Sequence, residues 1–193
     1  MYCTLAELKL FLKIKPDIEA DDIILTSFIQ SAQAIIESMT TRRFECATPT
    51  IRYFDADEAW KLKRTIYFDD DLHSIVSVTN GDGVVVTSAE YLPFPRHSTP
   101  IYSIRLKETS NIEWTYTDSP EDAIAVLGYW AYSLTPPADI KHATIRLASF
   151  LYRQKDNATD IDRPLMSGDG TIVMPTKLPA DIQAILKPYE RIV

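Results

Sequence analysis

The hydrophobic residues of the chain follow a helical spacing at both ends and a strand spacing in the middle. Between residues 21 and 44 apolar side chains recur every three or four positions and, at 100° per residue, cover an arc of roughly 140°. From about residue 48 to 135, β-branched and aromatic runs are separated by turn residues. We therefore predict an α+β fold, in which a small helical bundle (1–47 and 136–193) carries an inserted antiparallel β sandwich or barrel (48–135).

Two helices are predicted at the N-terminal end. Thr4 begins the first, because Thr4 and Glu7 have the spacing of a capping box, and Pro16 ends it. Asp21–Asp22 begin the second, where acidic groups interact favourably with the positive end of the helix dipole. Arg42–Arg43 stand where cations favour the C-terminal end of that helix.

The middle region predicts a series of short strands. The Asn80-Gly81-Asp82-Gly83 segment is the clearest hairpin signal in the chain. The predicted strands are residues 50–54, 65–68, 74–78, 84–88, 101–106, 112–116 and 123–132.

The third region returns to helical spacing. Pro137 stands in the first turn of a long helix, where its missing N–H costs nothing. One apolar stripe of this helix contains Ile140, Ala143, Leu147, Phe150 and Leu151. Residues 157–178 follow without periodicity, and a last short helix begins at Pro179 and is interrupted by Pro188.

Composition narrows the function classes. The net charge is −7, and residues 48–135 hold 13 acids and 7 bases, a net of −6, which argues against a protein that grips nucleic acid through a basic surface. Cys3 and Cys46 lie far apart and outside any C-x-x-C motif. Two such cysteines indicate no disulfide framework and suggest a reducing compartment. Neither a signal peptide nor an apolar run of about 20 residues is present, so we expect a cytoplasmic protein or one that leaves without secretion.

Catalytic chemistry finds little support. Asp69–His73, with the sequence DDDLH, is the best metal candidate, but an acidic loop before a strand is the favoured interpretation. An acid-dependent hydrolase using Asp69 to Asp71 and His73 is kept as a third hypothesis. The prediction is therefore no catalytic residues, no metal and no cofactor.

The second helix has an unusual polar side. Its residues there are small or uncharged, with Glu37 the only charge, whereas a surface helix usually carries lysines and glutamates. Small uncharged residues let another backbone approach with little desolvation cost. We therefore predict a subunit interface that also includes a second stripe on the long C-terminal helix; its residues are Ser27, Gln30, Ser31, Ala34, Ser38, Ile145 and Tyr152.

The order of these parts resembles a known family. A short TLAELKLFL helix, the long helix from Asp21 to Phe44, the AIAVLGYWAYS strand, the PPADIKHATIRLASFLYRQKD helix and a terminal LPADIQAILKPYERIV segment follow one another. This joint pattern is similar to the head–tail connector (adaptor, or head-completion) proteins of tailed bacteriophages and related particles. The resemblance is placed on both helical regions.

The resemblance implies a structural ring, typically of twelve subunits, beneath the portal of the capsid. Such a ring extends the DNA channel, offers a platform for the tail completion or stopper protein, and is located in the virion neck after assembly in the host cytoplasm. DNA passes without specific binding, and no membrane is involved. By the same analogy the C-terminal segment docks on the portal through Tyr189, Ile192 and Val193.

The alternative is a binding module whose β domain recognises a glycan or another protein. The aromatic run Tyr129, Trp130 and Tyr132 could stack on bases or sugars, although sheet core is the favoured interpretation. Alanine at Trp114 or Trp130 separates the two cases, because loss of folding identifies those residues as core.

Overall fold

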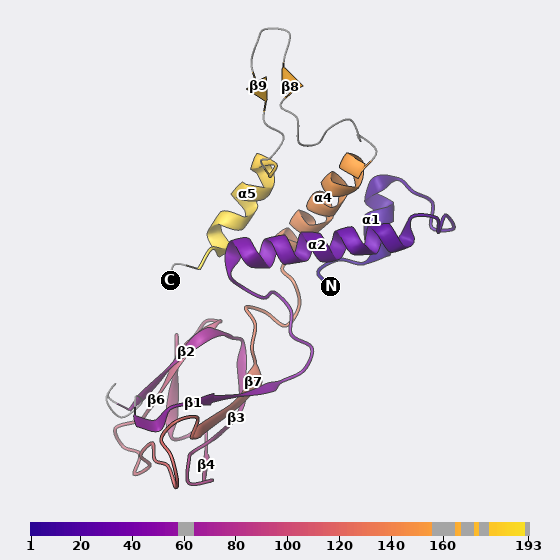
Figure 1. Cartoon of the computed structure of the whole chain (residues 1–193). Helices are drawn as coiled ribbons and strands as arrows, with labels where there is room; N and C mark the ends of the chain where they lie inside the picture. The colour runs from indigo at the N-terminus through magenta and orange to yellow at the C-terminus, as the bar shows by residue number, and fades with distance from the viewer. Residues whose placement is uncertain (58–63, 156–164, 167–171, 174–177, 192–193) are drawn as a thin grey trace. The chain divides into compact units, whose positions relative to one another are not determined.

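The computed structural model describes residues 1–57, 64–155, 165–166, 172–173 and 178–191 (Figure 1). The chain separates into two compact units, a helical unit (Met1–Thr41 with Pro136–Val193) and a β unit (Arg42–Thr135). Helices form the first and antiparallel sheets the second, so the predicted α+β class is confirmed. The predicted division into a helical domain (1–47 with 136–193) and an inserted β domain (48–135) stays a prediction.

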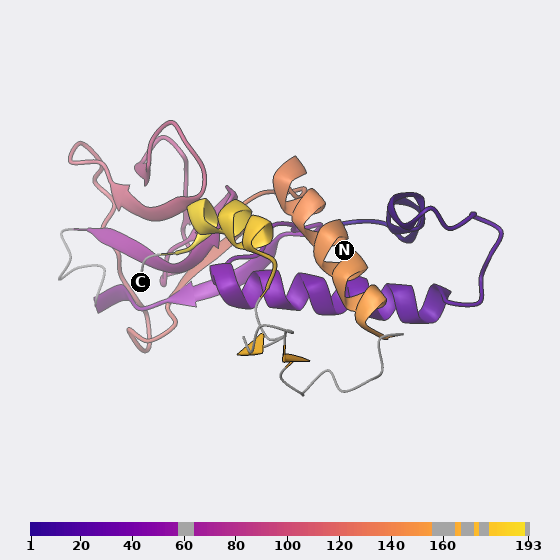
Figure 2. The same cartoon turned by 90° about the horizontal axis from the view of Figure 1, so that it is seen from above.

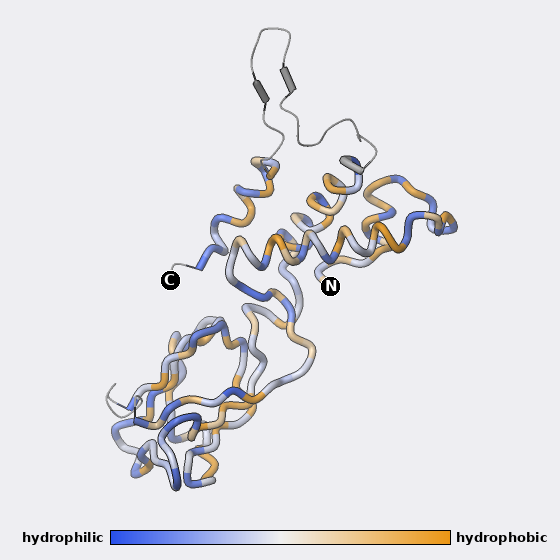
Figure 3. Tube along the Cα trace, viewed as in Figure 1, coloured by the Kyte–Doolittle hydropathy of each residue, from blue (hydrophilic) through white to orange (hydrophobic). Residues whose placement is uncertain are grey.

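The helical unit is organised around α2 and α4, which cross each other in Figures 1 and 2. Its elements are α1 (Leu5–Leu12), α2 (Asp22–Thr40), α4 (Ala138–Lys155), α5 (Ala180–Leu186) and the 3-10 turn η1 (Lys187–Tyr189). Both α1 and α5 also pack on α4. Hydrophobic positions recur along α2 (Figure 3), and its buried residues are Leu25, Ile29, Ala32, Ile36 and Thr40.

The predicted capping box at the start of α1 is confirmed. The Glu7 N–H donates to Thr4 Oγ1 at 3.2 Å, and the Thr4 N–H donates to Glu7 Oε2 at 2.9 Å. Two of the otherwise unpaired N–H groups are thereby satisfied. The helix ends at Leu12, because Lys13 adopts a left-handed conformation with φ of 61°.

The predicted role of Arg42–Arg43 at a helix C-terminus is wrong. α2 ends at Thr40, and Thr41 turns the chain with φ of 53°. Arg42 is instead part of the β unit, where its Nη1 donates to both carboxylate oxygens of Asp71 at 2.9 and 2.8 Å. A buried charge partner therefore determines the position of this arginine.

The β unit contains two antiparallel sheets. The first has the order β1 (Thr50–Phe54), β7 (Ile124–Tyr129), β3 (Ser74–Thr79), β4 (Val85–Val86); the second has the order β2 (Thr65–Leu72), β6 (Ile101–Leu106), β5 (Tyr91–Phe94). The predicted hairpin is confirmed, since Thr79 pairs with Val85 and Val78 with Val86.

Three strand predictions differ from the structure. Tyr91–Phe94 was missed because it contains Pro93, yet β5 is an edge strand, where proline is tolerated. Residues 112–116 form no strand, and the only pairing described there is an isolated bridge from Gly81 to Tyr116. The acidic run 69–71 is not a loop but belongs to β2.

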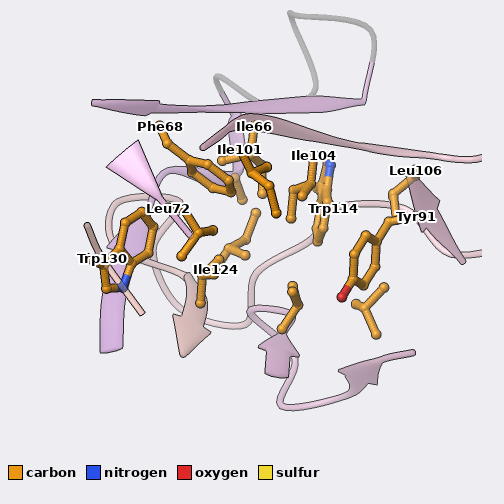
Figure 4. Close-up of a cluster of buried hydrophobic side chains, with 14 residues drawn as sticks. Ile66, Phe68, Leu72, Tyr91, Ile101, Ile104, Leu106, Trp114, Ile124 and Trp130 are labelled. Carbon is orange, nitrogen blue, oxygen red and sulfur yellow. The ribbon is translucent and has the colours of Figure 1, made fainter. Parts of the chain in front are cut away.

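Aromatic and branched side chains fill the space between the strands (Figure 4). Phe68 and Trp130 meet edge to face, with ring centroids 5.3 Å apart. The Trp130 indole donates to the Thr50 carbonyl at 2.9 Å, and the Trp114 indole donates to the Arg64 carbonyl at 2.9 Å. Buried indole N–H groups with partners are typical of core residues.

Residues 157–178 were predicted to lack regular structure. Within them β8 (Leu165–Met166) pairs with β9 (Ile172–Val173) in an antiparallel ladder. The prediction is therefore wrong at these four residues, and the neighbouring parts of the stretch lie outside the described residues.

Candidate subunit interface

One side of α2 is exposed in the part of the chain that the structure describes. Its buried residues face α4 and the rest of the helical core, and the opposite side is exposed along the whole helix. We call this side the open face; its residues are Ile23, Ser27, Gln30, Ser31, Ala34 and Ser38. Five of these six were predicted from the sequence as interface residues. Their exposure agrees with that prediction, and their role in assembly stays a prediction.

The open face carries no charge because Glu37 is directed elsewhere. The Tyr2 hydroxyl donates to Glu37 Oε1 at 2.6 Å, and Gln33 Nε2 donates to the same oxygen at 2.9 Å. Tyr2 is buried and Glu37 is half-buried. The N-terminal segment therefore contacts Glu37, the only charged residue of α2 beyond the first turn of the helix.

Ile23 belongs to the open face, and sequence reasoning missed it. Its side chain is 88% exposed, and the adjacent Ile24 is 41% exposed. Ile24 was counted in the buried arc, but it lies at the edge of that arc, next to Ser31 on the helix surface. The exposure of Ile23 could have been predicted from its position on the helix, which is on the side away from the buried Ile36, although its side chain is hydrophobic.

The predicted stripe on α4 is used within the helical unit. The Tyr152 hydroxyl donates to Asp21 Oδ2 at 2.5 Å, and its ring meets Phe28 of α2 edge to face at 6.4 Å. Ile145 is half-buried. Both residues are thus less available to a neighbouring subunit than the open face of α2.

The predicted portal-docking segment is only partly described. The Tyr189 hydroxyl donates to Asp139 Oδ2 at 2.7 Å, and the Arg191 N–H donates to the Thr40 carbonyl at 3.2 Å. These bonds hold the segment against the helical unit up to Arg191. Ile192 and Val193 lie outside the described residues.

The acidic residues Asp69 to Asp71 of β2 form ion pairs with arginines. Asp71 is buried against Arg42, and Asp70 Oδ2 receives a hydrogen bond from Arg52 Nη2 at 2.7 Å. Asp69 is 82% exposed. Asp70 and Asp71 are thus each held by an arginine, and Arg52 Nη1 lies 3.4 Å from Asp69 Oδ1. Among the described residues, no group of three or more His, Cys, Asp or Glu side chains could hold a metal ion.

The favoured interpretation of Trp130 as sheet core is confirmed, because this residue is 3% exposed and belongs to the core cluster. Some of the exposed apolar residues of the β unit lie on one face of the first sheet, namely Ile51, Tyr53 and Val85. The register places these residues in rows with Leu127 and Ala125. Alternation along each strand explains why Val126 and Val78 point into the core instead.

A family described as "Phage gp6-like head-tail connector protein" matches residues 2–79. This segment includes α1, α2 and the first three strands, whereas the resemblance had been placed on both helical regions. No curated protein matches the chain significantly. None of the helices among the described residues is long and apolar enough to cross a bilayer.

Solved structures extend the likeness to nearly the whole chain. A chain in the "Neck of empty GTA particle computed with C6 symmetry" has a TM-score of 0.59 and 16% identity, covering 98% of this chain and 89% of that chain. A chain in the "Neck of native GTA particle computed with C12 symmetry" has a TM-score of 0.58 and 14% identity, covering 98% of this chain and 88% of that chain. A chain in the "Virion of native gene transfer agent (GTA) particle" has a TM-score of 0.54 and 16% identity, covering 98% of this chain and 89% of that chain.

The resemblance to head–tail connector proteins is thereby confirmed over residues 2–79, and the solved structures show a similar fold over 98% of the chain.

Proposed function

We propose that the chain is a structural head–tail connector that forms a ring of identical copies in the neck of a phage-like particle. The family match over residues 2–79, together with the neck proteins that share the fold, carries this proposal. One of those necks was computed with C12 symmetry, which supports a ring of about twelve subunits. No catalytic step is proposed.

The open face of α2 supports a closed ring. A helix in a ring contacts its own core on one side and a neighbouring subunit on the other, and head-to-tail contacts close when the rotation between subunits fits. Ser27, Ser31 and Ala34 would let the neighbouring backbone come close. The absence of charge on this face keeps the desolvation cost of that contact low.

The acidity of the β unit supports passage of DNA without specific binding. Each phosphate held by Lys or Arg releases counterions and adds affinity, so a channel that DNA slides through should hold few such contacts. Residues 48–135 have a net charge of −6. The proposed neighbours along the channel are a portal protein on the capsid side and a tail completion or stopper protein on the tail side.

The C-terminal segment is proposed to dock on the portal. Tyr189 and Arg191 are held against the helical unit, which would leave Ile192 and Val193 as the terminal apolar contacts. Removing the last two residues should then weaken capture of the chain by the portal protein and leave contacts between copies of this chain unchanged.

The proposal is tested by deleting the gene from a genome that produces the particles. We expect DNA-filled heads without tails, restored when the gene is supplied in trans. Normally tailed particles would contradict the connector function. Co-purification of the chain with the portal protein of the same genome provides an independent measurement.

A binding module is the second candidate. Tyr53 and Tyr67 are exposed and line a groove of about 540 Å³ with Asp55, Asp69 and Asp122. Aromatic faces beside carboxylates are suited to sugar rings. Alanine at Tyr53 and Tyr67 would abolish glycan binding under this alternative, while a connector would still complete tailed particles.

A further inference from the structure

Two arginines of the β unit lie against one phenyl ring. The guanidinium carbon of Arg105 lies 5.1 Å from the centroid of the Phe94 ring, and that of Arg96 lies 5.5 Å from it. Arg96 is exposed, whereas Arg105 and Phe94 are half-buried. The ring attracts each cation, but two positive charges held at one ring also repel each other. We call Arg96 and Arg105 the arginine pair.

The arginine pair has no acidic partner within the described part of the chain. No carboxylate there forms an ion pair or a hydrogen bond with Arg96 or Arg105. Arg42 and Arg52 of the same unit, in contrast, each pair with an aspartate. Guanidinium groups form strong charge-assisted hydrogen bonds with carboxylates, so a carboxylate from another molecule would complete this site.

The same unit carries an acidic groove of about 710 Å³. Asp57, Asp82 and Glu113 line it, and none of its described lining residues is basic. Val84 and Tyr116 add an apolar part to the groove and are 51% and 47% exposed. An arginine side chain suits such a lining, because its guanidinium group pairs with carboxylates and stacks on aromatic rings.

The acidic groove lies at the end of the β unit where β2 begins and β3 ends. Asn80 follows β3, and its Nδ2 donates to the Glu113 carbonyl at 2.8 Å. Arg64 precedes β2, and its carbonyl accepts a hydrogen bond of 2.9 Å from the Trp114 indole. Residues 113–115 therefore join the two strand ends at the groove.

Strand β5 begins at this end of the unit and carries the chain away from it. Tyr91 pairs with Leu106, whose N–H donates to the Arg64 carbonyl at 3.1 Å. Phe94 lies three residues further along the strand, a rise of roughly 10 Å, and Arg96 follows two residues later. Arg96 thus stands toward the other end of the unit, away from the groove of its own copy.

We propose that Arg96 of one subunit, supported by Arg105, enters the acidic groove of the next subunit and pairs with Glu113 and its neighbouring acids. The contact is head to tail, because two unlike surfaces of each copy meet. A second copy fits better than DNA, because the net charge of −6 in residues 48–135 repels phosphates while the groove offers carboxylates. This inference rests on the proposed ring and adds a contact between its β units.

Charge reversal in rings assembled with the portal protein tests the contact. Arg96→Glu and Glu113→Lys change exposed side chains, and each alone should lower the yield of sedimenting rings at least fivefold at low salt. An equimolar mixture of the two variants should restore the yield, because in an alternating ring every contact again joins opposite charges. Arg43→Glu, at another exposed arginine of the β unit, is the matched control and should leave the yield unchanged.

A short thiol-to-thiol cross-linker measures the same contact directly. Cys46→Ser removes the less buried native thiol, and Cys3 stays because it is buried. Arg96→Cys and Glu113→Cys are then made singly and together. We expect the double variant to give a ladder of dimers, trimers and larger products, each single variant to stay monomeric, and a mixture of the two to stop at dimers.

The outcomes separate this inference from the connector function. Normal ring yields from both reversal variants, or rings without a cross-linked ladder, overturn the inference and leave the connector function intact. Restoration by both reversals in one chain, but not in the mixture, also overturns it, because the contact would then lie within one copy. Absence of rings from the unchanged chain overturns both proposals.

DNA is the other anion that the arginine pair could hold. A labelled DNA duplex should bind the unchanged chain and the Arg96→Glu variant equally weakly. If Arg96→Glu instead lowers duplex binding and leaves the ring yield unchanged, the arginine pair holds phosphates and the second copy is the wrong occupant.

Discussion

The Tyr2 hydroxyl donates a hydrogen bond of 2.6 Å to Oε1 of Glu37, which joins the N-terminal segment to α2. Beyond Asp22, Glu37 is the only charged residue of α2. By holding this carboxylate beside the N-terminal segment, Tyr2 leaves the open face uncharged. The contact thus connects the packing of the helical unit to the surface proposed for assembly.

Tyr2→Phe should destabilise the helical unit by about 1–2 kcal/mol, because a part-buried hydrogen bond to a charged acceptor is lost. The measurement is denaturant unfolding followed by circular dichroism at 222 nm. Tyr67→Phe is the matched control, since that side chain is exposed, and should change the unfolding free energy by less than about 0.5 kcal/mol. Equal effects of the two changes would contradict the structural role of Tyr2.

Ser31→Arg and Ala34→Glu should leave the isolated chain folded and reduce ring assembly at least a hundredfold. Both residues are exposed in one copy, and a charge at either would be buried without a partner between two copies. Sedimentation of complexes with the portal protein measures the effect. Asp118→Arg, at an exposed turn of the β unit, serves as control. Normal rings from both α2 variants would count against the interface.

Arg42→Met should destabilise the β unit by about 3–5 kcal/mol, because it removes the positive charge that compensates the buried Asp71. Asp69→Asn is the control, on the same strand as Asp71. It should lower the unfolding free energy by less than about 0.5 kcal/mol, since Asp69 is exposed. Tryptophan fluorescence follows this unit alone, because residues 60, 114 and 130 hold all three tryptophans. A small effect of Arg42→Met would show that the pair is not required for folding.

Trp130→Ala should destabilise the β unit by about 3–5 kcal/mol, as expected when a large core side chain leaves a cavity. Fluorescence of the remaining tryptophans during unfolding measures the loss. Tyr67→Ala should be nearly neutral. A folded Trp130→Ala variant that had only lost a binding activity would favour the binding module.

Thiol labelling should distinguish the two cysteines. Burial, assisted by the nearby Glu7 carboxylate, raises the pKa of the Cys3 thiol to about 11. At pH 8 only about 0.1% of Cys3 is therefore thiolate, the reactive form. Mass spectrometry after brief alkylation should find label on Cys46 and little on Cys3 until the pH rises toward 11 or the chain is unfolded. Rapid labelling of native Cys3 at pH 8 would contradict its burial.

The sequence predicted structural features well where residues close together in the chain form them. The Thr4–Glu7 capping box and the Asn80–Gly83 turn depend on residues close in sequence, and both are confirmed. The apolar arc of α2 also predicted its open face, because a surface without charge is visible in the sequence alone.

Long-range partners account for most of what the sequence did not predict. Arg42 was assigned to a helix end because its partner Asp71 is 29 residues away, and β2 continues through Asp69 to Asp71 because arginines pair with that run. Tyr152 was assigned to an interface although it bonds Asp21, which is 131 residues away.

Cryo-electron microscopy of the neck of the assembled particle tests the central claim most directly. We predict a closed ring of copies of this chain, in which Ser27, Ser31 and Ala34 of each subunit lie against its neighbour. A neck that lacks the chain, or a ring whose α2 helices face solvent along Ser27 to Ala34, would contradict the account.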